Sequence, residues 1–128
     1  MDTDEHRFGD LNRLTEKVIG CVYRVANTLG CGFLEKVYEN ALALELQKAG
    51  LGVRQQAPVQ VRYDGAVVGE YVADLLVEGT VLLELKAVKA IEDVHFAQCL
   101  NYLKASGLPL GLLVNFGTPR VQIKRVAN

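Results

Sequence analysis

The chain has 128 residues, of which 50% are hydrophobic and 23% are charged, and its formal net charge is −1. This length and composition predict one globular domain with a substantial core, and a net charge near zero excludes general attraction to polyanions. The sequence shows no signal peptide, no apolar run long enough to span a bilayer and no C-x-x-C pair among its three cysteines. We therefore expect a cytoplasmic protein with no membrane partner and no zinc site.

Two helices are predicted in the first part of the chain. Residues 1–10 are mostly polar and are expected to form a flexible N-terminus, with a single domain over residues 11–128. From Leu11 to Leu29 the apolar residues recur at helical spacing, and the glycines that follow end this helix. A second helix is predicted over residues 33–49, before Gly50.

The second part of the chain predicts strands and one further helix. Residues 59–63 alternate between polar and apolar, and Asp64-Gly65 is a strong signal for a hairpin turn into the next strand. The remaining expected elements are strands at 67–77 and 81–88, a helix at 93–106 with Phe96, Leu100 and Leu103 on its apolar side, and strands at 110–116 and 121–126. This order predicts an α/β fold in which helices flank one mixed sheet.

Three charged residues interrupt the apolar strands: Asp74 on one, and Glu84 and Lys86 on the next. Glu84 and Lys86 share a face because side chains alternate along a strand. If the intervening loop has an odd number of residues, Asp74 lies opposite Glu84, whereas a two-residue loop places the acids on opposite faces. Gly79 is compatible with either loop.

Two opposed carboxylates destabilise a strand pair, and a divalent cation would remove that conflict. Lys86, on the same face, would then lie within reach of a metal-bound water or a phosphate. From these three residues alone, charged side chains on a solvated sheet face are an equally good interpretation.

These residues resemble a known family. An Asp followed by Glu-x-Lys on the next strand is similar to the signature of the PD-(D/E)XK nuclease superfamily, with Ala73 in place of its proline. The segment GFLEKVY, residues 32–38, reads G-x-x-E-x-x-Y, and with YVADLLVEG, VLLELKAV and HFAQCLNYLKASG it resembles the GxxExxY protein family of that superfamily. The resemblance runs from about Leu11 to Val126 and implies a restriction-endonuclease-like αβββαβ core.

The resemblance also implies a metal-dependent nuclease. In such enzymes the Asp and Glu ligate Mg²⁺ or Mn²⁺ and the Lys orients the attacking water, roles that fall on Asp74, Glu84 and Lys86. Glu35 matches an early helical acid that often assists the metal. Its position in the first helical turn is also explained by the helix dipole alone.

The helix over residues 93–106 carries His95, Gln98 and Tyr102 on one stripe, beside its apolar side. Gln98 and Tyr102 are similar to the Q-x-x-x-Y motif of RecB-like nucleases. Gln98 is a candidate catalytic residue that would hold Lys86 or a phosphate oxygen, Tyr102 is a candidate to stack on a base or bond to a phosphate, and His95 is a further candidate to contact the substrate. A half-buried structural face is the alternative, most of all for His95. Arg120 and Lys124 belong to the one local concentration of basic residues and are candidate phosphate contacts.

The sequence therefore predicts a divalent-metal-dependent nuclease acting on nucleic acid, with DNA favoured over RNA. The alternative is a non-catalytic nucleic-acid-binding module or complex subunit on the same fold, since fold does not imply activity. A homodimer is compatible with either function.

Overall fold

The computed structural model describes the backbone of residues 3–128 and the side chains of residues 9–128. The elements in chain order are α1 (Thr3–Leu29), α2 (Glu35–Lys48), β1 (Val53–Tyr63), β2 (Ala66–Val77), β3 (Val81–Lys86), α3 (Asp93–Ser106), β4 (Leu110–Asn115) and β5 (Gln122–Ala127). This is the order that the sequence predicted.

No helix that the structure describes is both long and apolar enough to cross a membrane.

Two elements begin earlier than predicted. Helix α1 starts at Thr3 rather than Leu11. Residues 1–2 of the expected flexible segment lie outside the described residues. Strand β1 starts at Val53, before the predicted start at residue 59, and it contains Pro58. Because β1 is an edge strand, the missing N–H of a proline is tolerated within it.

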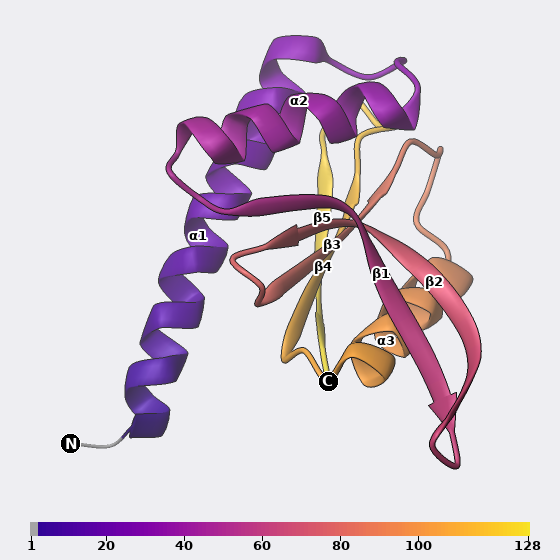
Figure 1. The fold of residues 1–128 in the computed structure, drawn as a ribbon. Helices are drawn as coiled ribbons and strands as arrows, with labels where there is room; N and C mark the ends of the chain where they lie inside the picture. Colours follow the sequence, from indigo (N-terminus) through magenta and orange to yellow (C-terminus); the bar gives the residue numbers. More distant parts are fainter. Residues whose placement is uncertain (1–2) are drawn as a thin grey trace.

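The five strands form one mixed sheet in the order β1-β2-β3-β4-β5 (Figure 1). Strands β3 and β4 are parallel and are connected through α3, whereas the other three pairings are antiparallel. Helices α1 and α2 cover one face of the sheet and α3 covers the other. Strand β4 is buried along its whole length, as its continuous apolar sequence predicted. The predicted α/β architecture is confirmed.

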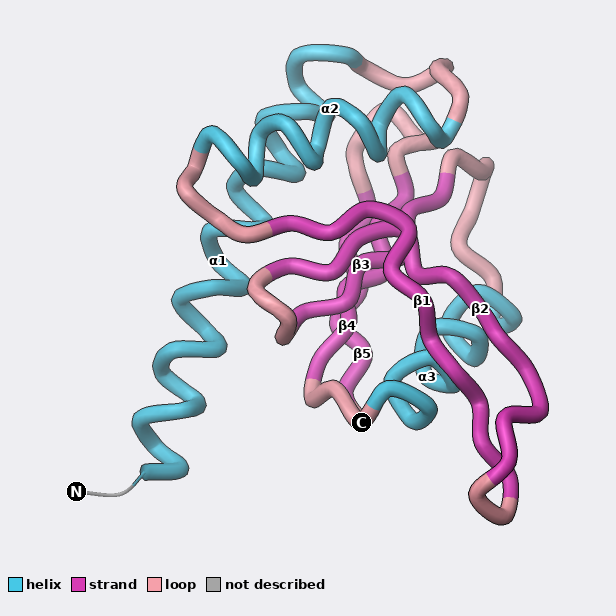
Figure 2. The backbone as a smooth tube through the Cα atoms, in the orientation of Figure 1, coloured by secondary structure: helices cyan, strands magenta, loops and turns pink. Residues whose placement is uncertain are grey.

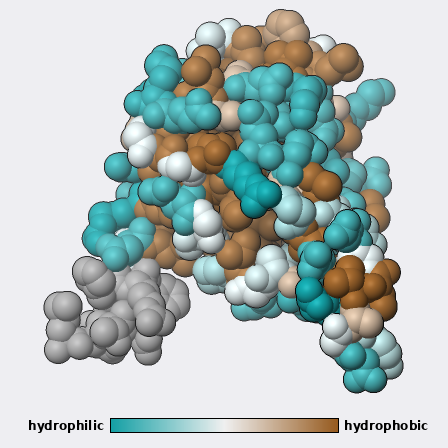
Figure 3. Space-filling model, viewed as in Figure 1, coloured by the Kyte–Doolittle hydropathy of each residue, from teal (hydrophilic) through white to brown (hydrophobic). Residues whose placement is uncertain are grey.

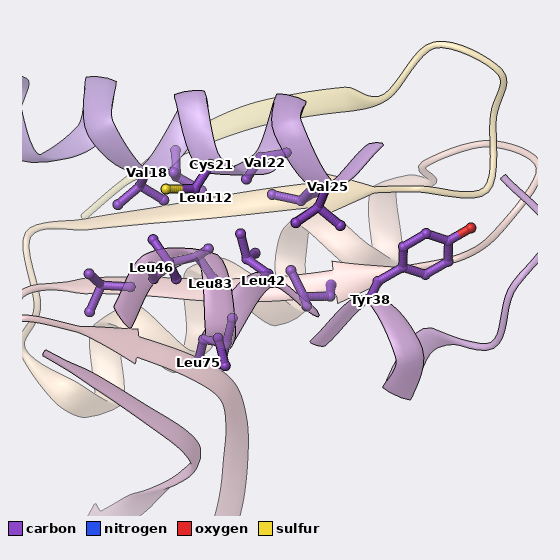
Figure 4. Packing of buried hydrophobic residues seen from close by; sticks show 14 of the residues in the cluster. Val18, Cys21, Val22, Val25, Tyr38, Leu42, Leu46, Leu75, Leu83 and Leu112 are labelled. Carbon is purple, nitrogen blue, oxygen red and sulfur yellow. The ribbon is translucent and has the colours of Figure 1, made fainter. Parts of the chain in front are cut away.

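The core lies in two layers, one on each side of the sheet. The larger layer packs α1 and α2 on the sheet through residues that include Val22, Leu42, Leu83 and Leu112 (Figure 4). The smaller layer packs α3 on the opposite face. The sequence predicted Phe96 on the apolar side of α3, but Phe96 is 40% exposed, and Tyr102 is buried with Leu103 and Cys99 instead.

Both predicted turns close hairpins. Asp64 and Gly65 both have positive φ, 54° and 81°, which is typical of a type I′ turn between paired Tyr63 and Ala66. The second loop has three residues, 78–80, and Val77 pairs with Val81. The odd-numbered loop is therefore the one that forms.

The hairpin of β1 and β2 bends at Gln56. This residue has a φ of 52° and interrupts the β1–β2 ladder, which resumes at Ala57 and Ala73. Beyond the bend, residues 57–73 form a two-stranded arm that leaves the sheet and extends over α3 (Figure 2). The interruption lies opposite Asp74, and this opens the sheet beside that residue.

Candidate active site

Asp74 and Glu84 meet where β2 parts from β3. The backbone ladder between these strands runs from Val77–Val81 to Leu75–Leu83, and the next pair in register is Asp74 and Glu84. At this pair the backbone N–H groups donate to side-chain carboxylates instead of to the carbonyl groups of the facing strand. The Asp74 N–H donates to Oε1 of Glu84 at 3.3 Å, and the Leu85 N–H donates to Oδ2 of Asp74 at 2.7 Å. Each carboxylate is thus held by the backbone of the opposite strand.

Burial makes this pair of acids costly to ionise. Glu84 is only 5% exposed, and the loss of water together with the charge of Asp74 raises the pKa of Glu84 to about 8. Desolvation also raises the pKa of Asp74, partly offset by the hydrogen bond from Leu85. Lys86 lowers the pKa of both carboxyls. The strand opening is therefore short of positive charge and suited to a cation.

Glu35 lies at the first residue of α2 and belongs to the same electrostatic neighbourhood. Partial desolvation raises the pKa of its carboxyl, and the charge of Asp74 raises it further, while Lys86 and His95 lower it. Glu35 therefore interacts electrostatically with Asp74, although its side chain is exposed at the surface.

The loop before Glu35 is fastened by Tyr38. The Tyr38 hydroxyl donates to the Gly30 carbonyl at 2.6 Å and accepts from the Phe33 N–H at 3.2 Å. Its buried ring stacks on Phe116 with centroids 4.5 Å apart. Gly32, with a φ of 112°, occupies a conformation that favours glycine. Tyr38 is a core residue, as predicted, and its hydroxyl also fixes the entry to α2.

Glu39 is a site residue that sequence reasoning missed. It is buried one helical turn after Glu35, and its carboxylate accepts from Lys36 at 3.0 Å, Gln55 at 2.7 Å and Gln56 at 2.6 Å. Its charge raises the pKa of both Asp74 and Glu35. Glu39 thus ties α2 to the bend of β1 that opens the sheet. The spacing of four residues from Glu35 was the available signal.

The stripe on α3 divides into two parts. His95 accepts the Glu92 N–H through Nδ1 at 3.0 Å and completes a capping box, so it helps to begin the helix. Gln98 donates to the Tyr102 hydroxyl at 3.1 Å. Burial raises the pKa of Tyr102, and the charges of Glu84 and Asp74 add to this effect. Tyr102 is therefore within the electrostatic influence of the carboxylates, and Gln98 is hydrogen-bonded to Tyr102.

The two basic candidates lie toward the other edge of the sheet. Lys124 is exposed on β5 and pairs with Leu113, which pairs in turn with Glu84. Lys124 and Glu84 therefore share a face, roughly 10 Å apart across two strand spacings. Arg120 is exposed in the loop that precedes β5.

Few side chains at the strand opening could ligate a metal ion. Within residues 9–128, no group of three or more acidic, histidine or cysteine side chains is arranged to hold a metal ion. The two carboxylates that do meet, Asp74 and Glu84, are hard oxygen donors. Mg²⁺ is commonly held in proteins by one or two carboxylates together with water and substrate phosphates. Chemically, the pair fits such an ion.

Comparisons with known proteins identify the family and the fold of the chain. The model of the PD-(D/E)XK nuclease superfamily matches residues 12–126. The crystal structure of SSO0001 has a similar fold, with a TM-score of 0.58 and 16% sequence identity, over 73% of this chain and 50% of that one. The chain thus spans about half the length of SSO0001, and a search of curated proteins found no match. Because the family model covers nearly all of the sequence, the chain belongs to the PD-(D/E)XK nuclease superfamily.

Proposed function

We propose that the chain is a divalent-metal-dependent nuclease that hydrolyses phosphodiester bonds in nucleic acid, with DNA favoured as the substrate. The observation that carries this proposal is the strand opening, where the buried Glu84 and the half-buried Asp74 face each other two residues from Lys86. Nothing in the folding of a sheet requires two opposed acids at that position, since the pair weakens the fold when ionised. Superfamily members are usually nucleases, and they generally use divalent metals.

Asp74 and Glu84 would hold Mg²⁺ or Mn²⁺, with Glu35 as a further ligand. The bound ion would supply a nucleophilic water and polarise the phosphate. Lys86 lies two residues after Glu84 on the same face, and its ammonium group would orient that water and offset the charge that develops on the phosphate. Gln98 and Tyr102 would contact the substrate from α3, and Arg120 and Lys124 would bind phosphates further along the strand.

We also place the chain in the GxxExxY family. The contacts of the motif support this assignment. Gly32 provides the positive φ, Glu35 begins α2 near the carboxylate pair, and Tyr38 secures the loop between them. Each named residue of the motif thus has a physical role in presenting one acid to the strand opening.

A second candidate is a non-catalytic nucleic-acid-binding module on the same fold. It is favoured by the small donor set, since only two carboxylates meet at the opening and no three-ligand group occurs within residues 9–128. Such a module would bind nucleic acid without cleaving it.

Cleavage assays separate the two functions. Single-stranded, double-stranded and branched DNA, and RNA, are incubated with the protein in Mg²⁺, in Mn²⁺ and in EDTA. We expect cleavage that requires a divalent ion and disappears in Lys86→Ala, while Lys17→Ala on α1 cuts like the wild type. Cleavage by Lys86→Ala at the wild-type rate would refute the proposed site. Binding of nucleic acid without cleavage under every condition would favour the second candidate.

A further inference from the structure

A groove with a volume of about 1040 Å³ lies between the β1–β2 arm and α3. Arg62 and Tyr71 line it from the arm, and Gln98, Tyr102 and Lys104 line it from α3. The carboxylate pair is not part of its lining. Tyr102 links the two regions, however, because it lines the groove and packs in the same buried cluster as Ala73, the neighbour of Asp74. One end of the groove therefore adjoins the strand opening.

The groove combines aromatic, apolar and amide surfaces with two cations. The ring of Tyr71 is 49% exposed and lies 5.3 Å from the ring of Tyr102, centroid to centroid. Val94 and Ala97 add apolar surface, and none of the described residues that line the groove is acidic. Figure 3 shows hydrophobic side chains on the protruding arm beside the groove, where the exposed apolar residues include Val67 and Val68. Exposed apolar surface of this kind marks a binding site.

This chemistry favours unpaired bases over a duplex. A duplex presents phosphates, and its affinity comes from several Lys or Arg contacts, whereas this groove has two cations in a chain of net charge −1. Unpaired bases stack on aromatic side chains and cover apolar walls, with a few cations to follow the backbone. The amide groups of Gln98 and its neighbours would bond to base edges.

The apolar part of the lining also favours DNA over RNA. Every ribose in RNA carries a 2′-hydroxyl, which costs free energy to bury without a hydrogen-bond partner. The side chains of Val59, Val94, Ala97 and Ala105 offer no such partner. A deoxyribose strand avoids this cost along the same wall.

We propose that the groove between the β1–β2 arm and α3 binds an unpaired DNA strand and leads it to the carboxylate pair. This inference rests on the nuclease function proposed above and narrows its substrate to single-stranded DNA or a duplex with a single-stranded tail. Tyr71 provides the exposed stacking surface, and Arg62 and Lys104 bind the phosphates on either side of it.

Binding measured without cleavage tests the groove directly. The fluorescence anisotropy of labelled oligothymidylate is recorded in EDTA, so that no cleavage is needed. Because stacking contributes about 1–3 kcal/mol per base, Tyr71→Ala should weaken binding by about 5- to 150-fold, and Tyr71→Phe should retain it. Tyr23→Ala is the matched control, since Tyr23 is 47% exposed on α1, across the sheet. Lys104→Ala, on the surface of α3, should weaken binding and reduce its dependence on salt.

Each result has one meaning. The proposed role of the groove is refuted if wild type, Tyr71→Ala and Lys104→Ala bind oligothymidylate with equal affinity. It is also refuted if the wild type binds a duplex or oligouridylate more tightly than oligothymidylate. A wild-type dimer that Tyr71→Ala converts to monomers in sedimentation overturns it too, because the surface then serves a second copy of the chain. If the variants weaken binding as expected but the wild type cuts no DNA in Mg²⁺ or Mn²⁺, the proposal that the groove binds an unpaired strand is supported and the proposed nuclease function is refuted. Cleavage of duplex DNA without any binding of single strands would support the nuclease function and refute the proposed role of the groove.

Discussion

Replacing Glu84 by glutamine should make the metal-free protein more stable at alkaline pH. The Glu84 carboxyl has a usual pKa of 4.5, and burial beside Asp74 raises the pKa to about 8 in the folded state. Between these two values the folded chain retains a proton that the unfolded chain has lost. Stability therefore falls as pH rises from about 4.5 to about 8, and it is lowest once Glu84 is ionised in the fold.

The size of this effect follows from the same two values. At about 1.36 kcal/mol per pKa unit, the interval from 4.5 to about 8 corresponds to about 5 kcal/mol of unfolding free energy. Solvent screens little of it, because Glu84 is 5% exposed. The amide introduced by Glu84→Gln would retain an oxygen that accepts the Asp74 N–H, so this substitution removes the charge and keeps the hydrogen bond. The gain at about pH 8 should approach this magnitude and vanish below pH 4.5.

Urea unfolding in EDTA at several pH values between about 4.5 and 8.5 measures the effect. The wild type should lose stability across this range, and Glu84→Gln should show a much flatter profile, with a residual slope from Asp74, whose pKa is also raised. Glu16→Gln, on the exposed side of α1, is the control and should follow the wild type. Parallel profiles for wild type and Glu84→Gln, or a variant that is less stable at about pH 8, would refute the electrostatic argument.

Three further outcomes follow from other contacts. Mg²⁺ or Mn²⁺ at ten times its dissociation constant should stabilise the wild type by about 1.4 kcal/mol in thermal melts, and a similar gain in Asp74→Asn would remove Asp74 from the ligands. Tyr38→Phe should cost about 1–3 kcal/mol in urea unfolding and accelerate amide exchange in the loop before α2, because two hydrogen bonds are lost; unchanged exchange would contradict this. Gly117→Ala should destabilise by at least about 2 kcal/mol in the same unfolding assay, since its Cβ would clash with the backbone of Val88, whereas Gly20→Ala meets nothing within 4 Å and should be tolerated.

Local sequence signals predicted the fold well. Alternation along residues 81–86 correctly placed Glu84 apart from Leu83 and Leu85, which pack under α1 and α2. The Asp64-Gly65 turn was placed correctly between the paired Tyr63 and Ala66, although the register of the arm shifts between Arg62 and Val61. These features depend on near neighbours in the chain, and side-chain periodicity is sufficient to predict them.

The features that sequence left open depend on distant contacts. Whether Asp74 faced Glu84 depended on loop geometry, and the bonds from Asp74 N–H and Leu85 N–H arise only because the strands part there. Glu39 is buried by glutamine side chains from β1, which reach it across the bend at Gln56. Positive φ at a glutamine has no signal in the sequence, so the bend was not predictable, and the spacing of Glu39 from Glu35 could not by itself show that the glutamines of β1 would bind Glu39.

The bend at Gln56 also divides the molecule into parts of unequal local stability. Strands β3 and β4 are buried at the centre of the sheet, whereas beyond the bend β1 and β2 pair with each other and rest on α3. A hairpin of two strands is marginal on its own, so residues 57–73 should open in partial unfolding events that leave the central strands intact. The carboxylates are anchored to the stable part, and Tyr71 and Arg62 to the part that opens first. On the proposal that the groove binds DNA, a strand too long to thread into the groove from its end would then enter from the side, while the acids and Lys86 keep their positions.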